Sequence, residues 1–156
     1  MRKITYLLII LCLTFLTACA KEEKVLPDDK IEKNIFTYDL YHPDQNCEKF
    51  LTKEIKTEKK DITNSINNEL KNVNMLRENV SLISIERTNE SITLNFSEEF
   101  LTQLCEQGSS GEYYMIGSLV NTFIGAYDVK EIIILVNGEI FESGHIYYDS
   151  PLTWYE

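Results

Sequence analysis

A cysteine whose surroundings could direct covalent chemistry lies near the start of the chain. The stretch LTAC (residues 16–19) places its thiol after an apolar residue and two small ones. This spacing is that of a lipobox, in which the thiol is the nucleophile that accepts diacylglycerol before a peptidase cleaves in front of it. We therefore expect Cys19 to be lipidated and to become the first residue of the mature chain. An ordinary secretory signal with a chance cysteine is the alternative.

The residues ahead of Cys19 predict the element that would deliver it to the peptidase. Residues 1–18 combine a positive start at Arg2 and Lys3 with a largely apolar run of 15 residues, from 4 to 18. A membrane-spanning helix needs about 20 apolar residues, so this shorter run has the architecture of a signal peptide. Acyl chains such as palmitate would then anchor the mature chain, because each buried CH₂ contributes roughly 0.8 kcal/mol. The expected location is the extracytoplasmic face of the cell membrane.

Two further cysteines, Cys47 and Cys105, lie in the part of the chain that would fold after export. Outside the cytoplasm a disulfide between them can persist. In the chain-entropy model, closing so long a loop would stabilise the folded state by roughly 4 kcal/mol. Two unpaired thiols are an equally weighted alternative, because a sequence does not show whether the two Cα atoms approach within about 7 Å.

The end of the chain is rich in aromatic residues that could contact a ligand. Tyr147, Tyr148, Trp154 and Tyr155 could stack against sugar rings or insert into a partner protein. The alternative, which we favour, is an edge strand followed by a C-terminal segment that folds back over the core.

Metal-binding constellations are sparse. His42 and His145 are far apart in sequence, and neither has a second ligand type at the spacing of a zinc motif. Asp39, His42 and Asp44 could form a loose cation site, but a solvated loop is the favoured interpretation. We expect no metal and no cofactor.

Candidate catalytic groups are equally few. Glu98 and Glu99 are adjacent, which favours the first turn of a short helix over the carboxylate pair of a hydrolase. The stretch 108–111 could offer backbone N–H groups to an anion at a helix start. We prefer a capping box there, because Ser109 precedes Glu112 by three residues. Cys105 has no basic neighbour in sequence that would activate it as a nucleophile. An enzyme is therefore not expected.

The charge balance excludes one class of partner. The chain has a formal net charge of −10, and removal of residues 1–18 leaves 13 basic and 25 acidic residues, a net charge of −12. Such a surface repels phosphate backbones and anionic headgroups, so we expect no binding to nucleic acid.

The apolar patterns predict a lipidated tether over residues 19–34 and one domain over residues 35–156. The expected strands are 35–41, 47–55, 80–86, 91–97 and 131–136, the last of them central in a sheet. An amphipathic helix is expected after Asp61, with Ile62, Ile66, Leu70 and Val73 on one stripe, and the principal helix over 111–126. Tight turns are expected at Asn89 and at Asn137-Gly138.

These elements, taken in order, resemble the GerMN domain of sporulation and spore germination proteins. The resemblance rests on LNFSEEF at the end of a strand, the break GSSGE, a helix carrying SLVNTF, the strand EIIILVNGE, and Pro151 near the end. It covers most of residues 35–152. It implies an α+β fold, a single small α/β sandwich with a mixed or mainly antiparallel sheet and two main helices packed on it, like ring-building motifs.

The resemblance also implies a function. GerMN domains carry no established catalytic residues and commonly occur in lipoproteins, which implies a noncatalytic interaction or assembly module that contacts envelope proteins. The family's description implies a setting in sporulation or germination. The alternative is a lipoprotein that binds cell-wall glycan, such as peptidoglycan, or a small molecule.

Overall fold

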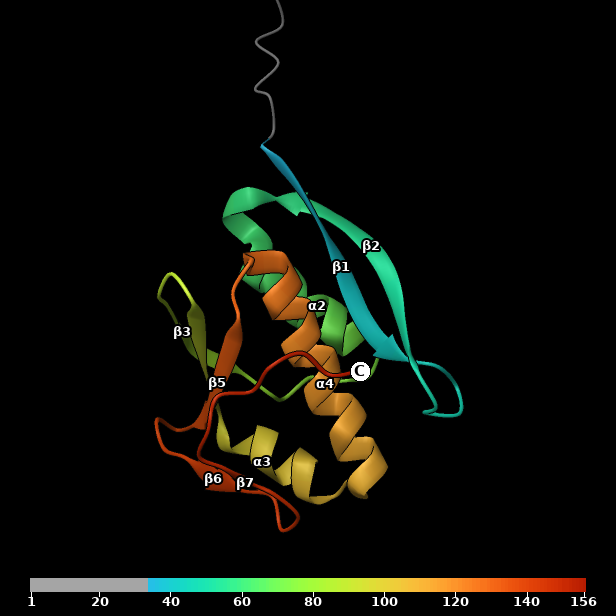
Figure 1. The fold of residues 1–156 in the computed structure, drawn as a ribbon, viewed down its shortest axis with the longest axis vertical. Helices are drawn as coiled ribbons and strands as arrows, with labels where there is room; N and C mark the ends of the chain where they lie inside the picture. The colour runs from blue at the N-terminus through green and yellow to red at the C-terminus, as the bar shows by residue number, and fades with distance from the viewer. Residues whose placement is uncertain (1–33) are drawn as a thin grey trace, which may run out of the picture. The chain divides into compact units, whose positions relative to one another are not determined.

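The computed structural model describes residues 34–156, so the expected signal peptide, Cys19 and most of the tether lie outside the described residues. The described chain begins with a ribbon of two strands, β1 (Ile35–Pro43) and β2 (Phe50–Glu58), then a 3-10 turn and helix α2 (Ile62–Asn72). Strands β3 (Leu82–Arg87) and β4 (Ser91–Phe96) precede helices α3 (Glu98–Cys105) and α4 (Ser109–Tyr127). Strands β5 (Glu131–Val136), β6 (Phe141–Glu142) and β7 (Tyr147–Tyr148) complete it (Figure 1).

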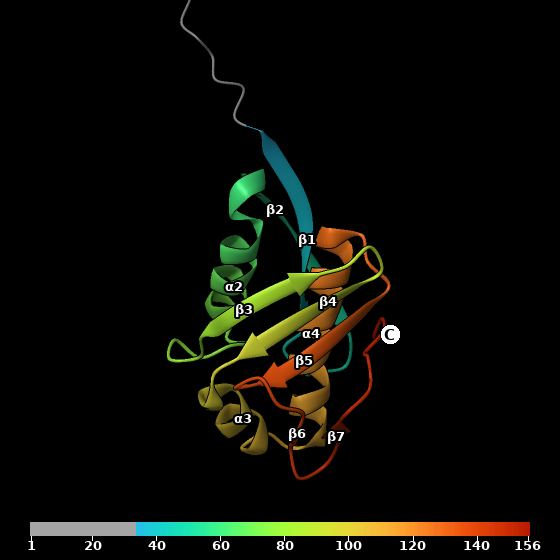
Figure 2. The ribbon, with the colours of Figure 1, turned by 90° about the vertical axis from the view of Figure 1, so that its left-hand side faces the viewer.

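Helix α4 is the centre of the domain. The β1–β2 ribbon covers one side of it and the β3–β4–β5 sheet covers the other, as Figures 1 and 2 show from two directions. Residues such as Ile116, Val120 and Phe123 are buried, and so are polar residues on the same helix. A helix that is covered on two faces needs apolar residues around most of its circumference, which this sequence supplies.

The three-stranded sheet is mixed. β3 pairs antiparallel with β4, and β4 pairs parallel with β5. The expectation that β5 is central was wrong: β4 lies in the middle, and apart from its pairing with β4, β5 forms only isolated bridges, between Ile132 and Leu152 and between Val136 and Glu139. The buried and partly buried residues of β5 alternate, because one face of the strand packs on α4 and the other is partly open to solvent. The expected α+β class with a mixed sheet is confirmed, and the two main helices, α2 and α4, are accompanied among the described residues by the short helix α3.

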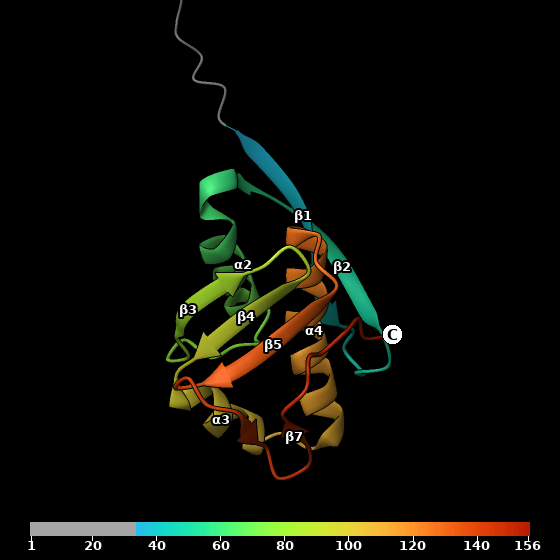
Figure 3. The same cartoon turned by 60° about the vertical axis from the view of Figure 1, so that its left-hand side comes forward.

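The amphipathic helix follows its expected pattern. Ile62, Ile66 and Leu70 of α2 are buried, and Figure 3 shows this helix beside the sheet and α4. Asp61 is the N-cap residue, although its side chain makes no capping hydrogen bond. The apolar stripe is therefore what fixes the helix in place.

The turn at Asn137-Gly138 has the expected backbone conformation, and the turn at Asn89 does not. Asn137 and Gly138 both have positive φ, at 51° and 85°, as a type I′ turn requires. Asn89 does not adopt a positive φ. Instead the Thr88 hydroxyl accepts hydrogen bonds from the backbone N–H groups of Glu90 and Ser91, so a side chain builds this turn.

One glycine is required by close packing. A Cβ at Gly117 would collide with the Phe50 ring and lie 3.1 Å from the Cβ of Tyr155. Gly117 therefore lets the β1–β2 ribbon and the C-terminal segment approach the backbone of α4. At Gly125, near the end of the same helix, a Cβ would meet nothing within 4 Å.

Candidate functional site

The C-terminal segment is fastened to α4 by one buried side chain. Asn121 is 1% exposed, and its amide binds the backbone of Tyr155 on both sides. Its Nδ2 donates to the Tyr155 carbonyl at 2.9 Å, and its Oδ1 accepts from the Tyr155 N–H at 2.8 Å. Tyr155 lies in no strand, so the Asn121 amide supplies the hydrogen-bond partners that a neighbouring strand would give to its backbone N–H and C=O. The segment that carries Trp154 is therefore held in one place.

Aromatic rings gather around that segment. We call Tyr41, Phe50, Tyr113, Trp154 and Tyr155 the aromatic shelf. Trp154 meets Tyr41 edge to face, with ring centroids 5.1 Å apart, and Tyr113 lies 5.2 Å from Tyr155 and 6.0 Å from Phe50. These residues come from β1, β2, α4 and the end of the chain.

The shelf borders an open hollow of about 440 Å³, lined by Tyr113 and residues 151–156. Trp154 is 47% exposed and Tyr113 is also exposed, so their rings are available to solvent. Burial, followed by the nearby Tyr113 and Glu112, raises the pKa of the Tyr155 hydroxyl above its ordinary value. Burial followed by Asp39 has the same effect on the pKa of Tyr41. The hydroxyls of Tyr41 and Tyr155 are therefore neutral at ordinary pH, and the shelf presents apolar ring faces beside them.

The four aromatic residues singled out in the sequence separate into two places. Trp154 and Tyr155 belong to the shelf, whereas Tyr147 and Tyr148 form β7, which pairs with β6. Tyr147 is 54% exposed, but Tyr148 is buried and its ring stacks on Phe141 at 4.7 Å. Tyr148 therefore serves packing, in agreement with the alternative of a segment folded over the core.

A buried carboxylate lies behind β7 and the shelf. Glu112, 1% exposed, accepts hydrogen bonds at Oε1 from the Ser143 hydroxyl at 2.6 Å and the Tyr148 hydroxyl at 2.7 Å. Its Oε2 is buried without a hydrogen-bond partner. The expected capping box is thus wrong: the N-cap of α4 is Gly108, no side chain caps it, and Glu112 points into the domain. Burial and Glu112 together raise the pKa of Tyr148 well above its ordinary value.

The two cysteines of the domain stay apart in the structure. Cys47 lies between β1 and β2 with a φ of 53°, and Cys105 ends α3. Both are exposed free thiols. Whether the two thiols pair after export stays a prediction, which thiol labelling can test.

No group of three or more potential metal ligands occurs within residues 34–156. His42 contacts the Pro43 carbonyl through Nδ1, and His145 lies in the loop between β6 and β7. Glu98 and Glu99 occupy the first turn of α3, as expected, and Glu98 accepts a hydrogen bond from Asn137 at 3.0 Å. A hydrogen bond from Ser97 lowers the pKa of the exposed Glu99 carboxyl.

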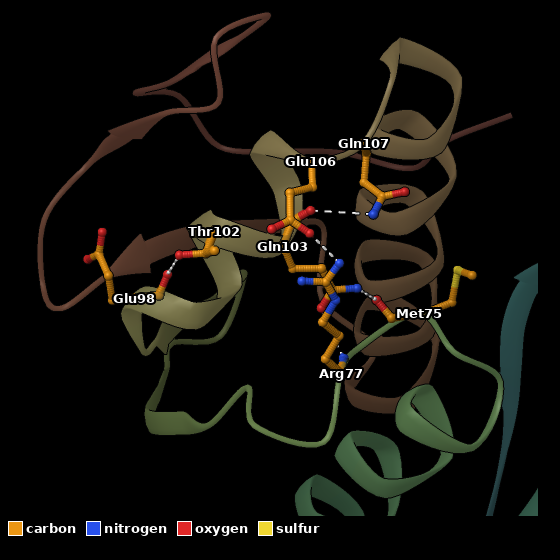
Figure 4. A network of polar contacts seen from close by, with 7 residues as sticks. All are labelled: Met75, Arg77, Glu98, Thr102, Gln103, Glu106 and Gln107. Carbon is orange, nitrogen blue, oxygen red and sulfur yellow. Dashed lines mark hydrogen bonds and ion pairs between the residues drawn. The ribbon is translucent and has the colours of Figure 1, made fainter.

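A second buried polar side chain, Gln103, joins α3 to the loop after α2 (Figure 4). Its Oε1 accepts from the Arg77 N–H at 2.9 Å, and its Nε2 donates to the Met75 carbonyl at 3.2 Å. Arg77 also pairs with Glu106, the C-cap residue of α3. This network fixes the loop after α2 against α3, and both polar atoms of the Gln103 side chain have partners within the domain.

Sequence reasoning missed Glu112, Asn121 and Gln103 as organising residues. Asn121 lies on the otherwise apolar stretch of α4 between Val120 and Phe123, and an amide at a buried helical position needs partners. That signal was present in the sequence. Glu112 gave no such signal, because a carboxylate in a first helical turn is ordinarily a solvated capping group.

Comparison with known proteins identifies the family. The model described as Germane, Sporulation and spore germination, matches residues 36–142, which is more than half of the chain. The chain belongs to this family. No curated protein matches it significantly. None of the helices within residues 34–156 is both long and apolar enough to cross a bilayer.

Two solved structures share the fold of the Germane domain. The tandem GerMN domains of the sporulation protein GerM from Bacillus subtilis align with a TM-score of 0.53 and 22% identity, over 77% of this chain and 45% of that one. A candidate lipoprotein from Clostridium perfringens aligns with a TM-score of 0.51 and 16% identity, over 77% of this chain and 88% of that one. The chain thus spans less than half of the GerM tandem.

Proposed function

We propose that this Germane-family chain is a lipid-anchored, noncatalytic docking domain of the bacterial cell envelope, with a role in sporulation or germination. Cys19 carries the lipid, and the domain stands on the extracytoplasmic face of the cell membrane. The lipobox at residues 16–19 supports the anchor. The family, with its description of sporulation and spore germination, supports the setting.

The observation that carries the docking function is the fixed exposure of Trp154. Its ring is about half exposed, yet the backbone beside it is clamped by Asn121 and its edge rests on Tyr41. Large aromatic side chains that are immobilised before binding lose little entropy on contact, and they dominate the free energy of protein interfaces. The aromatic shelf is therefore the surface on which we place the partner protein.

Crosslinking in intact cells tests this function. A photoreactive amino acid replaces Thr153, which is exposed beside Trp154, and in a matched protein it replaces Ile83, which is exposed on β3. We expect a discrete crosslinked protein from position 153, lost with Trp154→Ala and absent from position 83. Equal products from both positions would argue against a specific shelf.

The anchor is tested separately by intact mass of the membrane-extracted protein. We expect loss of residues 1–18 and a lipid adduct, both absent in Cys19→Ala. An uncleaved or unlipidated product would refute the anchor without affecting the docking surface.

A second function is favoured by the hollow beside the shelf. Its volume of about 440 Å³ and its aromatic lining suit a sugar ring of cell-wall glycan. Cosedimentation with purified peptidoglycan distinguishes glycan binding from docking to a protein. If glycan binds here, Trp154→Ala should abolish the cosedimentation. A net charge of −12 opposes binding to anionic wall polymers, which ranks this function second.

A further inference from the structure

The hairpin formed by β6 and β7 is too short to be stable by itself. Each strand has two residues, and isolated hairpins of any length are marginal in water. Its inner face supplies the missing stability: Phe141 stacks on Tyr148 and meets Phe100 edge to face, with centroids 6.1 Å apart. Ser143 and Tyr148 both donate to Glu112.

Glu112 thus holds the hairpin from both sides of its loop. Ser143 follows β6 and Tyr148 belongs to β7, so one carboxylate on α4 fixes the spacing of the two strands. The Ser143 hydroxyl in turn accepts from the N–H groups of His145 and Ile146, at 3.2 and 3.1 Å. The loop is therefore ordered from within, and its outer residues are presented in fixed positions.

The outer face combines apolar and acidic side chains. Glu142 pairs with Tyr147, and Ile140 and Asp149 flank the two strands on either side of the Phe141–Tyr148 pair. All four residues are exposed, as is Ile146 in the loop. We call these five residues the hairpin face.

The charge of this region has a single sign. Residues 139–156 contain four carboxylate side chains and no lysine or arginine. Within residues 34–156, the ion pairs of the domain involve Glu54, Glu58, Glu69, Glu90 and Glu106. Glu139, Glu142 and Asp149 have no basic partner there, so their charge is available to a binding partner.

We propose that the hairpin face docks a protein segment in which lysine or arginine alternates with apolar residues. Ile140, Ile146 and Tyr147 would bury against the apolar residues of that segment, while Glu142 and Asp149 would pair with its cations. Paired charges at the rim of an apolar contact select the partner and speed association. This proposal rests on the proposed docking function and names the chemistry of a partner.

The same observations disfavour other occupants. A second copy in a two-fold interface would bring the carboxylates of both hairpin faces together, and like charges in contact are repulsive. An anionic lipid surface would be repelled for the same reason. The hairpin also lies at the opposite end of the described domain from the start of β1 (Figures 1 and 2).

Binding of defined peptides tests the proposal. The full-length lipidated chain in nanodiscs of neutral phosphatidylcholine is titrated with three peptides: alternating Lys and Val, alternating Lys and Gly, and alternating Glu and Val. We expect measurable affinity for the Lys–Val peptide, at least about tenfold weaker affinity for Lys–Gly, and none for Glu–Val. Equal affinity for Lys–Gly would show nonspecific attraction of a polycation and overturn the proposal, as would no binding of Lys–Val.

Variants locate the binding surface. Glu142→Lys with Asp149→Lys should weaken Lys–Val binding by at least about tenfold, and Tyr147→Ala by several-fold. Ile83→Ala and Glu86→Lys on β3 are controls, because Ile83 has the same 54% exposure as Tyr147. Unchanged affinity in the hairpin variants, or an equal loss in the controls, would overturn the proposal.

Two further outcomes would show that the hairpin face binds something other than a basic protein segment. Concentration-dependent dimers that are abolished by Glu142→Lys would assign the face to a second copy, and binding to anionic vesicles would assign it to lipid. Either result overturns a basic protein segment as the occupant. Crosslinks from position 153 report on the aromatic shelf, so they distinguish failure of this proposal from failure of the docking function.

Discussion

The hydroxyl of Tyr148 donates a hydrogen bond of 2.7 Å to the buried carboxylate of Glu112, which joins β7 to the first turn of α4. This contact crosses 36 residues of sequence. It links the last strand of the domain to its central helix through two side chains that sequence reasoning had assigned to other roles.

Replacing Glu112 should distinguish its hydrogen bonds from its charge. Glu112→Ala leaves the Ser143 and Tyr148 hydroxyls without their acceptor and opens a cavity, so we expect the free energy of unfolding to fall by about 2–4 kcal/mol. Glu112→Gln keeps an acceptor oxygen and nearly the same side-chain volume, so the free energy of unfolding should fall by about 1 kcal/mol or less. Urea unfolding measures both. Equal losses would show that the charge matters more than the hydrogen bonds.

Tyr148 predicts a loss of stability in alkaline solution. Its folded-state pKa is raised above the ordinary value of 10.0, so the folded state binds the phenolic proton more tightly than the unfolded state does. The stability that Tyr148 contributes through this proton is fully present below pH 10 and is lost progressively as the pH rises above that value. We expect stability to fall above pH 10, and Tyr148→Phe to show a shallower fall. A parallel slope in the variant would contradict this role.

Asn121→Ala should release the C-terminal segment. Two hydrogen bonds to the Tyr155 backbone disappear, and we expect a loss of about 1–3 kcal/mol together with greater mobility of Trp154. Trp154 is the only tryptophan of the chain, so its fluorescence anisotropy reports this motion directly. Asn68→Ala, at an exposed position on α2, is the control: it should leave the mobility of Trp154 unchanged and should not lower stability, because alanine favours a helix.

The two glycines of α4 should respond in opposite directions. Gly117→Ala places a methyl group against the Phe50 ring, and we expect destabilisation by about 1–3 kcal/mol. Gly125→Ala meets nothing within 4 Å and should stabilise the helix by up to about 1 kcal/mol. Thermal unfolding of the two variants provides the comparison. Destabilisation of equal size at both positions would argue against close packing at Gly117.

Thiol labelling tests the state of the cysteines after export. Cys47 and Cys105 are exposed and unpaired, so both should react with a maleimide in the folded protein without prior reduction. Labelling that requires a reductant would show that a disulfide forms after all.

Local patterns in the sequence predicted the elements whose cause is local. The alternation of Ile92, Leu94 and Phe96 gave β4, and the spacing of Ile62, Ile66 and Leu70 gave the buried face of α2. At Asn137 and Gly138 the turn follows from residues that tolerate positive φ. In each case the physical reason lies within a few neighbouring residues.

What could not be predicted depends on distant contacts. An apolar run such as β5 looks the same whether it is central or lateral, because its neighbours come from other parts of the chain. Glu112 fits the capping-box pattern, but Ser143 and Tyr148, more than 30 residues away, draw it inward. The aromatic shelf likewise collects residues from both ends of the domain, which periodicity alone does not bring together.

The register of β1 and β2 has a mechanical consequence. All nine residues of β1, from Ile35 to Pro43, pair with β2 in one uninterrupted antiparallel ladder. Tension applied at Ile35 along the strand would load these pairs in shear, so that their hydrogen bonds share the force. Tension across the strand would instead open them one after another. The resistance of the domain to pulling should therefore depend on direction.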